Sequence, residues 1–169
     1  MPETPLSKKD KRFEKGNVLF SCRNIDTIGV IDREKKKVVW AWGPGNLDRQ
    51  HMPTMLPNGH ILIYDNGTHR KYTRIIELDP LSEKIVWEYK ADPPKSFFSP
   101  TRGSSQRIPN GNTFIAESDS GRLFEVTRDG KIVWEFLNPD RKKNGRRMDL
   151  YRAIRYSKED VERVLSRTR

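Results

Sequence analysis

The sequence has little cysteine and no long apolar run. Its single cysteine, Cys22, excludes an internal disulfide and leaves the redox compartment open. The longest apolar runs, such as HILIY at 60–64, are far too short to cross a bilayer, so no membrane partner is expected. The first residues, MPETPLSKKDKRFEKG, lack the apolar core of a signal peptide. This fits a cytoplasmic protein if the start is genuine, and an exported one if an upstream leader has been lost.

The residue groups that usually bind metals or nucleotides are also missing. The three histidines, His51, His60 and His69, are nine residues apart, which matches no close-spaced ligand pattern, and one cysteine gives no CxxC pair. No Gly-rich phosphate loop and no GxSxG elbow are present. We therefore expect neither a metal nor another cofactor.

Charge is plentiful, and its excess lies at the ends of the chain. The net charge is +10, and residues 141–169 hold 11 basic and 4 acidic side chains, while residues 1–16 hold 5 and 3. A basic end of this kind binds phosphates weakly and without sequence preference, and more often it is simply a solvated surface. No specific nucleic-acid partner is expected.

A repeat of 47 residues is the strongest pattern in the sequence. Trp40, Trp87 and Trp134 are spaced 47 and 47 residues apart, each at the end of a strand–turn–strand pattern, and the turns LPNGH and IPNGN form a second echo. One repeat reads as four short strands, which is the size of a β-propeller blade. We expect an all-β partial β-propeller of about three four-stranded blades, with each tryptophan packed between neighbouring blades. An open β-sandwich would not explain the strict period.

The repeat also sets the expected boundaries. The first blade has no innermost strand, the segment MDLYRAIRYS adds one strand after the third, and a short helix follows, with Ser157 and Asp160 as its capping pair. Propellers usually close with 4–8 blades, so open edges are expected to favour self-association. The expected parts are a polar segment within a truncated blade (1–15), a partial propeller (16–156, blades roughly 16–44, 49–91 and 101–138) and a basic helix (157–169).

Three short motifs then give a family resemblance. SCRN at 21–24, QHMPT at 50–54 and DNG at 65–67 occur in that order. Over roughly residues 16–156 the chain resembles the C-terminal half of bacterial-type arylsulfotransferases. The resemblance implies a six-bladed propeller with its site in the central funnel. It also implies transfer of a sulfuryl group from an aryl sulfate to a phenol through a sulfated histidine, so an aryl sulfate and a phenol are the expected small-molecule partners.

The resemblance also implies roles for particular residues. His51 matches the nucleophilic histidine, and Arg23 matches an arginine that contacts the sulfuryl oxygens. Asp65 and Asn66 match the segment after the nucleophile and are expected at the substrate. From the chemistry rather than the resemblance, His69 is a candidate substrate-binding residue that could protonate the leaving phenolate if its loop faces the funnel. The family's His-x-Asn pair would lie before residue 1, so activity is expected of a complete propeller.

The chemistry is reasonable on its own terms, and a second interpretation stays open. A neutral imidazole is a nucleophile near pH 7, and a guanidinium fork suits sulfuryl oxygens. The alternative function is a non-catalytic, quinoprotein-like propeller that acts as a protein-binding scaffold, in which His51 is only a loop residue. His60 aligns with Asn112 in a turn and is expected to be structural.

Overall fold

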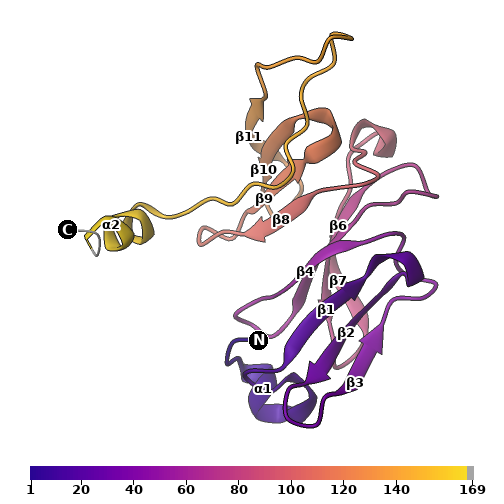
Figure 1. Cartoon of the computed structure of the whole chain (residues 1–169), viewed down its shortest axis with the longest axis vertical. Coiled ribbons are helices and arrows are strands. Elements are labelled where there is room, and N and C mark those ends of the chain that lie inside the picture. Colours follow the sequence, from indigo (N-terminus) through magenta and orange to yellow (C-terminus); the bar gives the residue numbers. More distant parts are fainter. Residues whose placement is uncertain (167–169) are drawn as a thin grey trace.

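The computed structural model describes residues 1–166 and shows three antiparallel sheets side by side (Figure 1). The first sheet has three strands and the other two have four, and within each sheet the strands follow one another in chain order. These are the three blades that the repeat predicts, so the partial β-propeller is confirmed. The strands are β1 (Val18–Cys22), β2 (Thr27–Asp32), β3 (Lys37–Trp42), β4 (His51–Met55), β5 (Ile61–Asp65), β6 (Arg74–Asp79), β7 (Lys84–Tyr89), β8 (Ser104–Arg107), β9 (Thr113–Glu117), β10 (Arg122–Val126) and β11 (Ile132–Leu137).

The helical elements are short and lie outside the sheets. The N-terminal segment, expected as a polar stretch, forms α1 (Pro5–Lys9) and η1 (Lys11–Phe13). Single 3-10 turns follow at η2 (Arg23–Ile25), η3 (Pro94–Ser96) and η4 (Ser118–Ser120). None of the helices in residues 1–166 is long and apolar enough to cross a membrane.

The predicted C-terminal helix is present as α2 (Lys158–Ser166). Its first turn is capped as expected, because the Ser157 hydroxyl accepts from the Asp160 backbone N–H at 3.0 Å and donates to its carboxylate at 2.8 Å. Residues 167–169 of the expected helical segment lie outside the described residues. In Figure 1, α2 stands apart from the sheets at the end of a long extended segment.

The Pro-Asn-Gly turns join the first and second strands of blades two and three. Gly59 and Gly111 have φ values of +91° and +88°, the left-handed conformation that glycine adopts without steric cost. The two turns close with equivalent backbone hydrogen bonds: Leu56 N–H to His60 O at 2.8 Å, and the Ile108 N–H to the Asn112 carbonyl at 3.0 Å. The repeat in the sequence is therefore a repeat in hydrogen bonding.

Two apolar cores lie between neighbouring blades. The first fills the space between blades one and two, and the second fills the space between blades two and three. Both faces of blade two are therefore covered, which is why every residue of β5 is buried, including its polar end at Asp65. A strand covered on both faces reads as a continuous apolar run, and ILIY in β5 is such a run.

Trp87, on the outermost strand of blade two, contacts two arginines of blade three. Its indole Nε1 donates to the Arg128 carbonyl at 2.8 Å, and the guanidinium groups of Arg107 and Arg128 lie 4.6 and 5.2 Å from its ring. Trp40 is buried in blade one, where Phe13 packs against it at 5.4 Å. Trp134 is 41% exposed, because no described blade follows blade three.

The segment after blade three differs from the expected single strand. Residues 148–156 are extended but form no regular strand, and none of the described strands pairs with them. Their backbone is bonded instead to side chains of β8: the Ala153 N–H donates to Ser104 Oγ at 3.2 Å, and the Arg155 N–H donates to Gln106 Oε1 at 2.9 Å.

Glu77 of blade two forms ion pairs with Arg107 and Arg128 of blade three. These ion pairs should make the stability of the protein depend on pH. The carboxylate is buried and receives hydrogen bonds from Asn58, His60, Arg107 and Arg128. Burial raises its pKa, but these hydrogen bonds and charges outweigh burial and hold the pKa below its usual range. Because the folded pKa is depressed, the stabilisation is complete above the unfolded value of about 4.3 and is lost as pH falls through the folded value.

Glu77→Gln is therefore expected to lower the free energy of unfolding by about 2 kcal/mol at pH 7. The expected loss is smaller than the loss for a fully buried ion pair, because Arg128 is half exposed and water screens its charge. The difference between the variant and the parent should shrink below about pH 4. Urea unfolding between pH 3 and 7 at one protein concentration measures this, with exposed Glu34→Gln as the control. A Glu77→Gln difference that is independent of pH would contradict the assignment.

Candidate functional site

His51 opens β4, the innermost strand of blade two, at an irregular point of the backbone. It pairs with Tyr64, but the next pair is Thr54 with Leu62, so a bulge lies between them. Within the bulge Met52 has a φ of +49°, which is unusual for a residue with a side chain. Bulges re-aim side chains and are frequent beside active sites. The bulge thus sets the direction of the His51 ring.

The neighbouring residue, Gln50, anchors this strand to blade one. Its side chain is fully buried, and its Nε2 donates to the Thr27 carbonyl at 2.8 Å and to Ser21 Oγ at 3.0 Å. Ser21 lies in β1 and Thr27 is the first residue of β2, so both partners belong to blade one. The amide therefore fixes the backbone immediately before the bulge, and the position of His51 depends on contacts with two blades.

Asn66 sets the tautomer of His51. Its Nδ2 donates to the carbonyls of Ser99 at 2.6 Å and Arg102 at 3.0 Å, so its Oδ1 must be the atom that faces His51 Nδ1 at 2.7 Å. An amide oxygen only accepts, so Nδ1 carries the proton and the neutral ring has its lone pair on Nε2. Asn66 is fully buried, which makes this arrangement rigid. In the neutral ring, Nε2 of His51 is therefore the nitrogen that has no proton.

His51 faces a hollow of about 360 Å³ whose wall carries two arginines. Arg102 is ion-paired with Asp149 through one guanidinium nitrogen at 3.0 Å, and Arg152 comes from the extended segment after blade three. A guanidinium presents several donors in one plane, so an anion in this hollow would meet positive charge beside the His51 ring. The hollow is lined by His51, Met52, Thr101, Arg102, Gly103, Tyr151 and Arg152.

Arg23, the second expected catalytic residue, lies in η2 and is not among the residues that line this hollow. One guanidinium nitrogen donates to the Pro100 carbonyl at 3.3 Å, and the other contacts Asn24 at 3.4 Å. Pro100 immediately precedes Thr101, which lines the hollow. Arg23 is therefore close to the loop that shapes the site, while Arg102 and Arg152 are the arginines that line the hollow itself.

Asp65, expected at the substrate, is completely buried and bound by protein groups. Its carboxylate accepts from the Asp48 backbone N–H at 2.8 Å and from Arg74 Nε at 2.8 Å, and Arg70 lies at 3.1 Å. Burial raises the pKa of Asp65, although the two arginines act in the opposite direction. In the structure Asp65 stabilises the loop that follows β5 and does not line the hollow.

His69 and His60 are both held by carboxylates away from the hollow. His69 Nδ1 lies 2.8 Å from Asp48 Oδ1, and its side chain is 68% exposed. His60 Nδ1 lies 2.8 Å from Glu77 Oε1 in the turn before β5. Neither ring lines the hollow that contains His51. Within residues 1–166, no group of three or more His, Cys, Asp or Glu side chains is arranged to hold a metal ion.

The sequence reasoning missed the arginines of the hollow. Arg102 directly precedes Gly103, the residue that aligns with His51 one repeat earlier, so the alignment itself carried the signal. Arg152 had no such signal, because its position depends on how the segment after blade three folds back beside β8. The hydrogen bond from His51 to Asn66 was also hidden, since DNG is an ordinary turn sequence.

Comparison with known proteins identifies the family. The family model of arylsulfotransferases (ASST) matches residues 7–139, and the chain belongs to this family. No curated protein matches the sequence.

Solved structures agree on the fold. A protein of unknown function from Bacteroides caccae is 16% identical with a TM-score of 0.55, over 77% of this chain and 47% of its own. A streptogramin B lyase is 19% identical with a TM-score of 0.55, over 75% and 39%. A catalytically inactive virginiamycin B lyase from Staphylococcus aureus with quinupristin is 18% identical with a TM-score of 0.55, over 83% and 41%. These neighbours share the propeller-like architecture, and this chain spans less than half of their length.

Gly103, in the wall of the hollow, packs so closely on Tyr64 that a side chain at this position should destabilise the protein. A Cβ at this position would lie 2.1 Å from the Tyr64 ring, whereas a Cβ at Gly111 would meet nothing within 4 Å. Both residues have positive φ, so alanine is strained at both positions. Gly103→Ala should therefore lower the free energy of unfolding by about 2 kcal/mol more than Gly111→Ala, because it also overpacks the core. Denaturant unfolding of the two variants measures the difference, and equal losses would contradict the contact.

Proposed function

We propose that this arylsulfotransferase-family chain transfers a sulfuryl group from an aryl sulfate to a phenol through His51. The observation that carries the proposal is the 2.7 Å hydrogen bond between His51 Nδ1 and Asn66 Oδ1. It leaves the lone pair on Nε2, on a residue that lines a hollow with two arginines. A histidine that served only as a loop residue would not require a buried amide to fix its tautomer.

The reaction has two displacement steps. In the first, the His51 Nε2 lone pair forms a bond to sulfur while the bond between sulfur and the aryl oxygen breaks, and the phenolate leaves with that electron pair. The ring then carries a positive charge, and Asn66 Oδ1 stabilises it by accepting from Nδ1–H. In the second, the oxygen of the acceptor phenol forms the new bond to sulfur, the N–S bond breaks, and the phenolic proton passes to solvent.

Arginines would hold the sulfuryl oxygens during both steps. Negative charge remains on these oxygens throughout transfer, so fixed guanidinium donors stabilise the transition state. Arg102 and Arg152 line the hollow, and we assign them this contact. Arg23, which the family resemblance favours, supports the adjoining loop through the Pro100 carbonyl and would add positive charge there.

The other expected substrate-binding residues take supporting roles in this proposal. Asn66 positions His51 and binds the loop that carries Arg102. Asp65 binds Arg70 of the loop after β5, and His69 of the same loop pairs with Asp48. The proposal therefore places direct contact with the substrate on His51 and the arginines of the hollow.

The test is a rapid-mixing assay with a nitrophenyl sulfate. The folded 169-residue chain should release nitrophenolate in a burst of one equivalent per site, followed by turnover that depends on added phenol. His51→Asn should abolish the burst while the circular dichroism spectrum stays unchanged, because asparagine is polar but cannot accept the sulfuryl group. His60→Asn is the matched control and should keep the burst, since Asn112 makes the equivalent contact with a glutamate one blade later.

Two results would contradict this mechanism. Retention of the full burst by His51→Asn would make another group the nucleophile. Absence of any burst in the folded parent chain would favour the non-catalytic scaffold for this polypeptide.

A further inference from the structure

Blade one has an unoccupied inner edge. β1 pairs with β2 from Val18↔Ile31 to Cys22↔Thr27, and none of the described strands pairs with the other edge of β1. In blade two, β4 occupies the equivalent edge of β5. Residues 5–13 of blade one form α1 and η1 in place of that strand. Met1 bonds to the backbone of Gly16 and Asn17 just before this edge, and the Cys22 carbonyl at its far end accepts from Gln50 Nε2 at 3.5 Å. Between these two points the edge can accept a further strand.

A hollow of about 380 Å³ lies along the same edge. Its wall includes Val18 and Leu19 of β1, and Pro53 and Met55 of β4 from the neighbouring blade. In the complete blades this kind of space is filled by the side chains of the innermost strand. Met1 and Pro2 of the N-terminal segment line the hollow as well, so its apolar lining fits an apolar side chain from a strand added at this edge.

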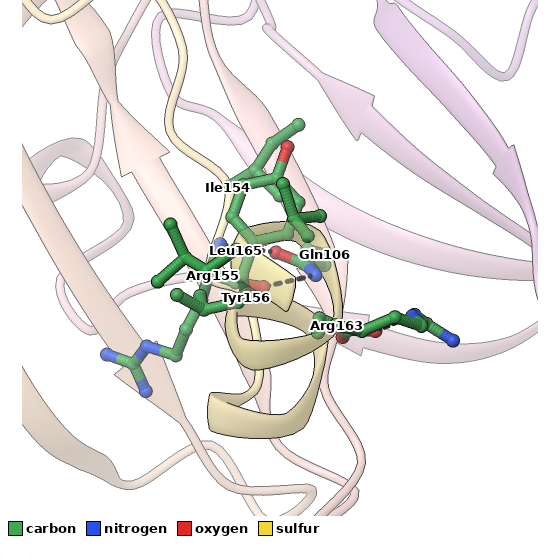
Figure 2. Close-up of a pocket in the computed structure, with 9 residues that line it drawn as sticks. Gln106, Ile154, Arg155, Tyr156, Arg163 and Leu165 are labelled. Carbon is green, nitrogen blue, oxygen red and sulfur yellow. Dashed lines mark hydrogen bonds and ion pairs between the residues drawn. The ribbon is translucent and has the colours of Figure 1, made fainter. Parts of the chain in front are cut away.

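After blade three the chain continues as an extended segment that belongs to none of the three sheets. Residues 148–156 are extended beside β8, and Figure 2 shows Gln106 at the backbone of this segment, where its Nε2 donates to the Arg155 carbonyl at 3.0 Å. The Ser104 hydroxyl contacts Ala153 in the same way at 3.2 Å. No second strand within residues 1–166 pairs with this segment.

Arg155 shows which position in a propeller this segment occupies. Arg107, in the innermost strand of blade three, lies 4.6 Å from the Trp87 ring of blade two. Arg155 lies 4.7 Å from the Trp134 ring of blade three. Each arginine also pairs with a buried glutamate of the blade that it covers. Residues 148–156 are therefore placed as the innermost strand of a further blade.

Both ends of the row of blades also expose apolar faces. On blade three, Trp134 and Phe136 are 41% and 40% exposed. On blade one, Val18 and Val38 are 49% and 58% exposed, on the face that points away from blade two. The corresponding faces of blade two are covered by its neighbours. The two exposed faces thus correspond to the two sides of a normal contact between blades.

We propose that two copies of this chain close one six-bladed propeller by exchanging strands. Residues 148–156 of each copy add to β1 of the other, so that each blade one gains its fourth strand. The exposed face of blade three then packs on the completed blade one of the other copy, twice, about a two-fold axis. This inference does not depend on the proposed chemistry.

The strand count favours a second copy as the occupant. Blade one has an open inner edge, and residues 148–156 are an extended segment that none of the described strands pairs with, so each copy can fill the edge of the other. Six blades fall within the 4–8 at which propellers close.

The register follows from blade three. There Arg107 pairs with Thr113, the first residue of β9. The same register places Arg155 of one copy opposite Val18 of the other, and Tyr151 opposite Cys22. Ile154, which is 40% exposed, would then point into the hollow beside Leu19.

Size-exclusion chromatography with light scattering tests the closed pair. The 169-residue chain should elute as one species of twice 19.8 kDa. Ile154→Lys places a charge in the hollow and should shift the mass toward the monomer. Leu81→Lys, which changes an equally exposed apolar residue in the β6–β7 turn, should not. A monomeric parent chain, or an open series of higher oligomers, would overturn the proposal.

A cysteine pair tests the register. Opposed residues in antiparallel strands have Cα atoms about 4.5–5.5 Å apart, within disulfide range. Tyr151→Cys should therefore form a disulfide with Cys22 of the other copy and run as a covalent dimer under non-reducing conditions. Tyr156→Cys lies about 16 Å further along the strand and should remain uncrosslinked. Equal crosslinking of both variants, or a disulfide within one chain, would contradict the register.

Discussion

The structure depends on one constraint: a blade has two apolar faces and cannot cover either of them by itself. Blade two satisfies the constraint on both sides, and every residue of its strand β5 is buried. Arginines contribute to the cover, because the guanidinium of Arg107 lies over the Trp87 ring and also pairs with the buried Glu77 carboxylate. Blades one and three are each covered on one side only, and this leaves the exposed faces and the open strand edge at the ends of the row.

The same contact between blades builds the site. Ser99 and Arg102 lie in the loop that precedes β8 of blade three. Their backbone carbonyls accept both amide hydrogens of Asn66 in blade two. This fixes the orientation of Asn66, and Asn66 in turn fixes the proton of His51. A residue on one blade therefore acquires its chemical state from a neighbouring blade. Loss of the packing between blades two and three would disturb the orientation of His51 as well as the fold.

The fold was predictable because its signals are local and repeated. The tryptophan period and the Pro-Asn-Gly turns each mark one blade, and the capping pair of α2 needs only Ser157 and Asp160. The site was predictable only in part. The QHMPT motif pointed to His51, but the role of Asn66 depends on two carbonyl groups that are more than 30 residues away in sequence. Arg152 reaches the hollow only after the chain has folded back beside β8, which no local pattern encodes.

The central claim is that His51 carries the sulfuryl group between donor and acceptor. Mass spectrometry of the protein, mixed with a nitrophenyl sulfate and quenched before any phenol is added, tests this most directly. We predict a mass increase of one sulfuryl group, assigned by fragmentation to His51 and removed when phenol is supplied. An adduct on another residue, or sulfated product formed without any adduct, would contradict the account.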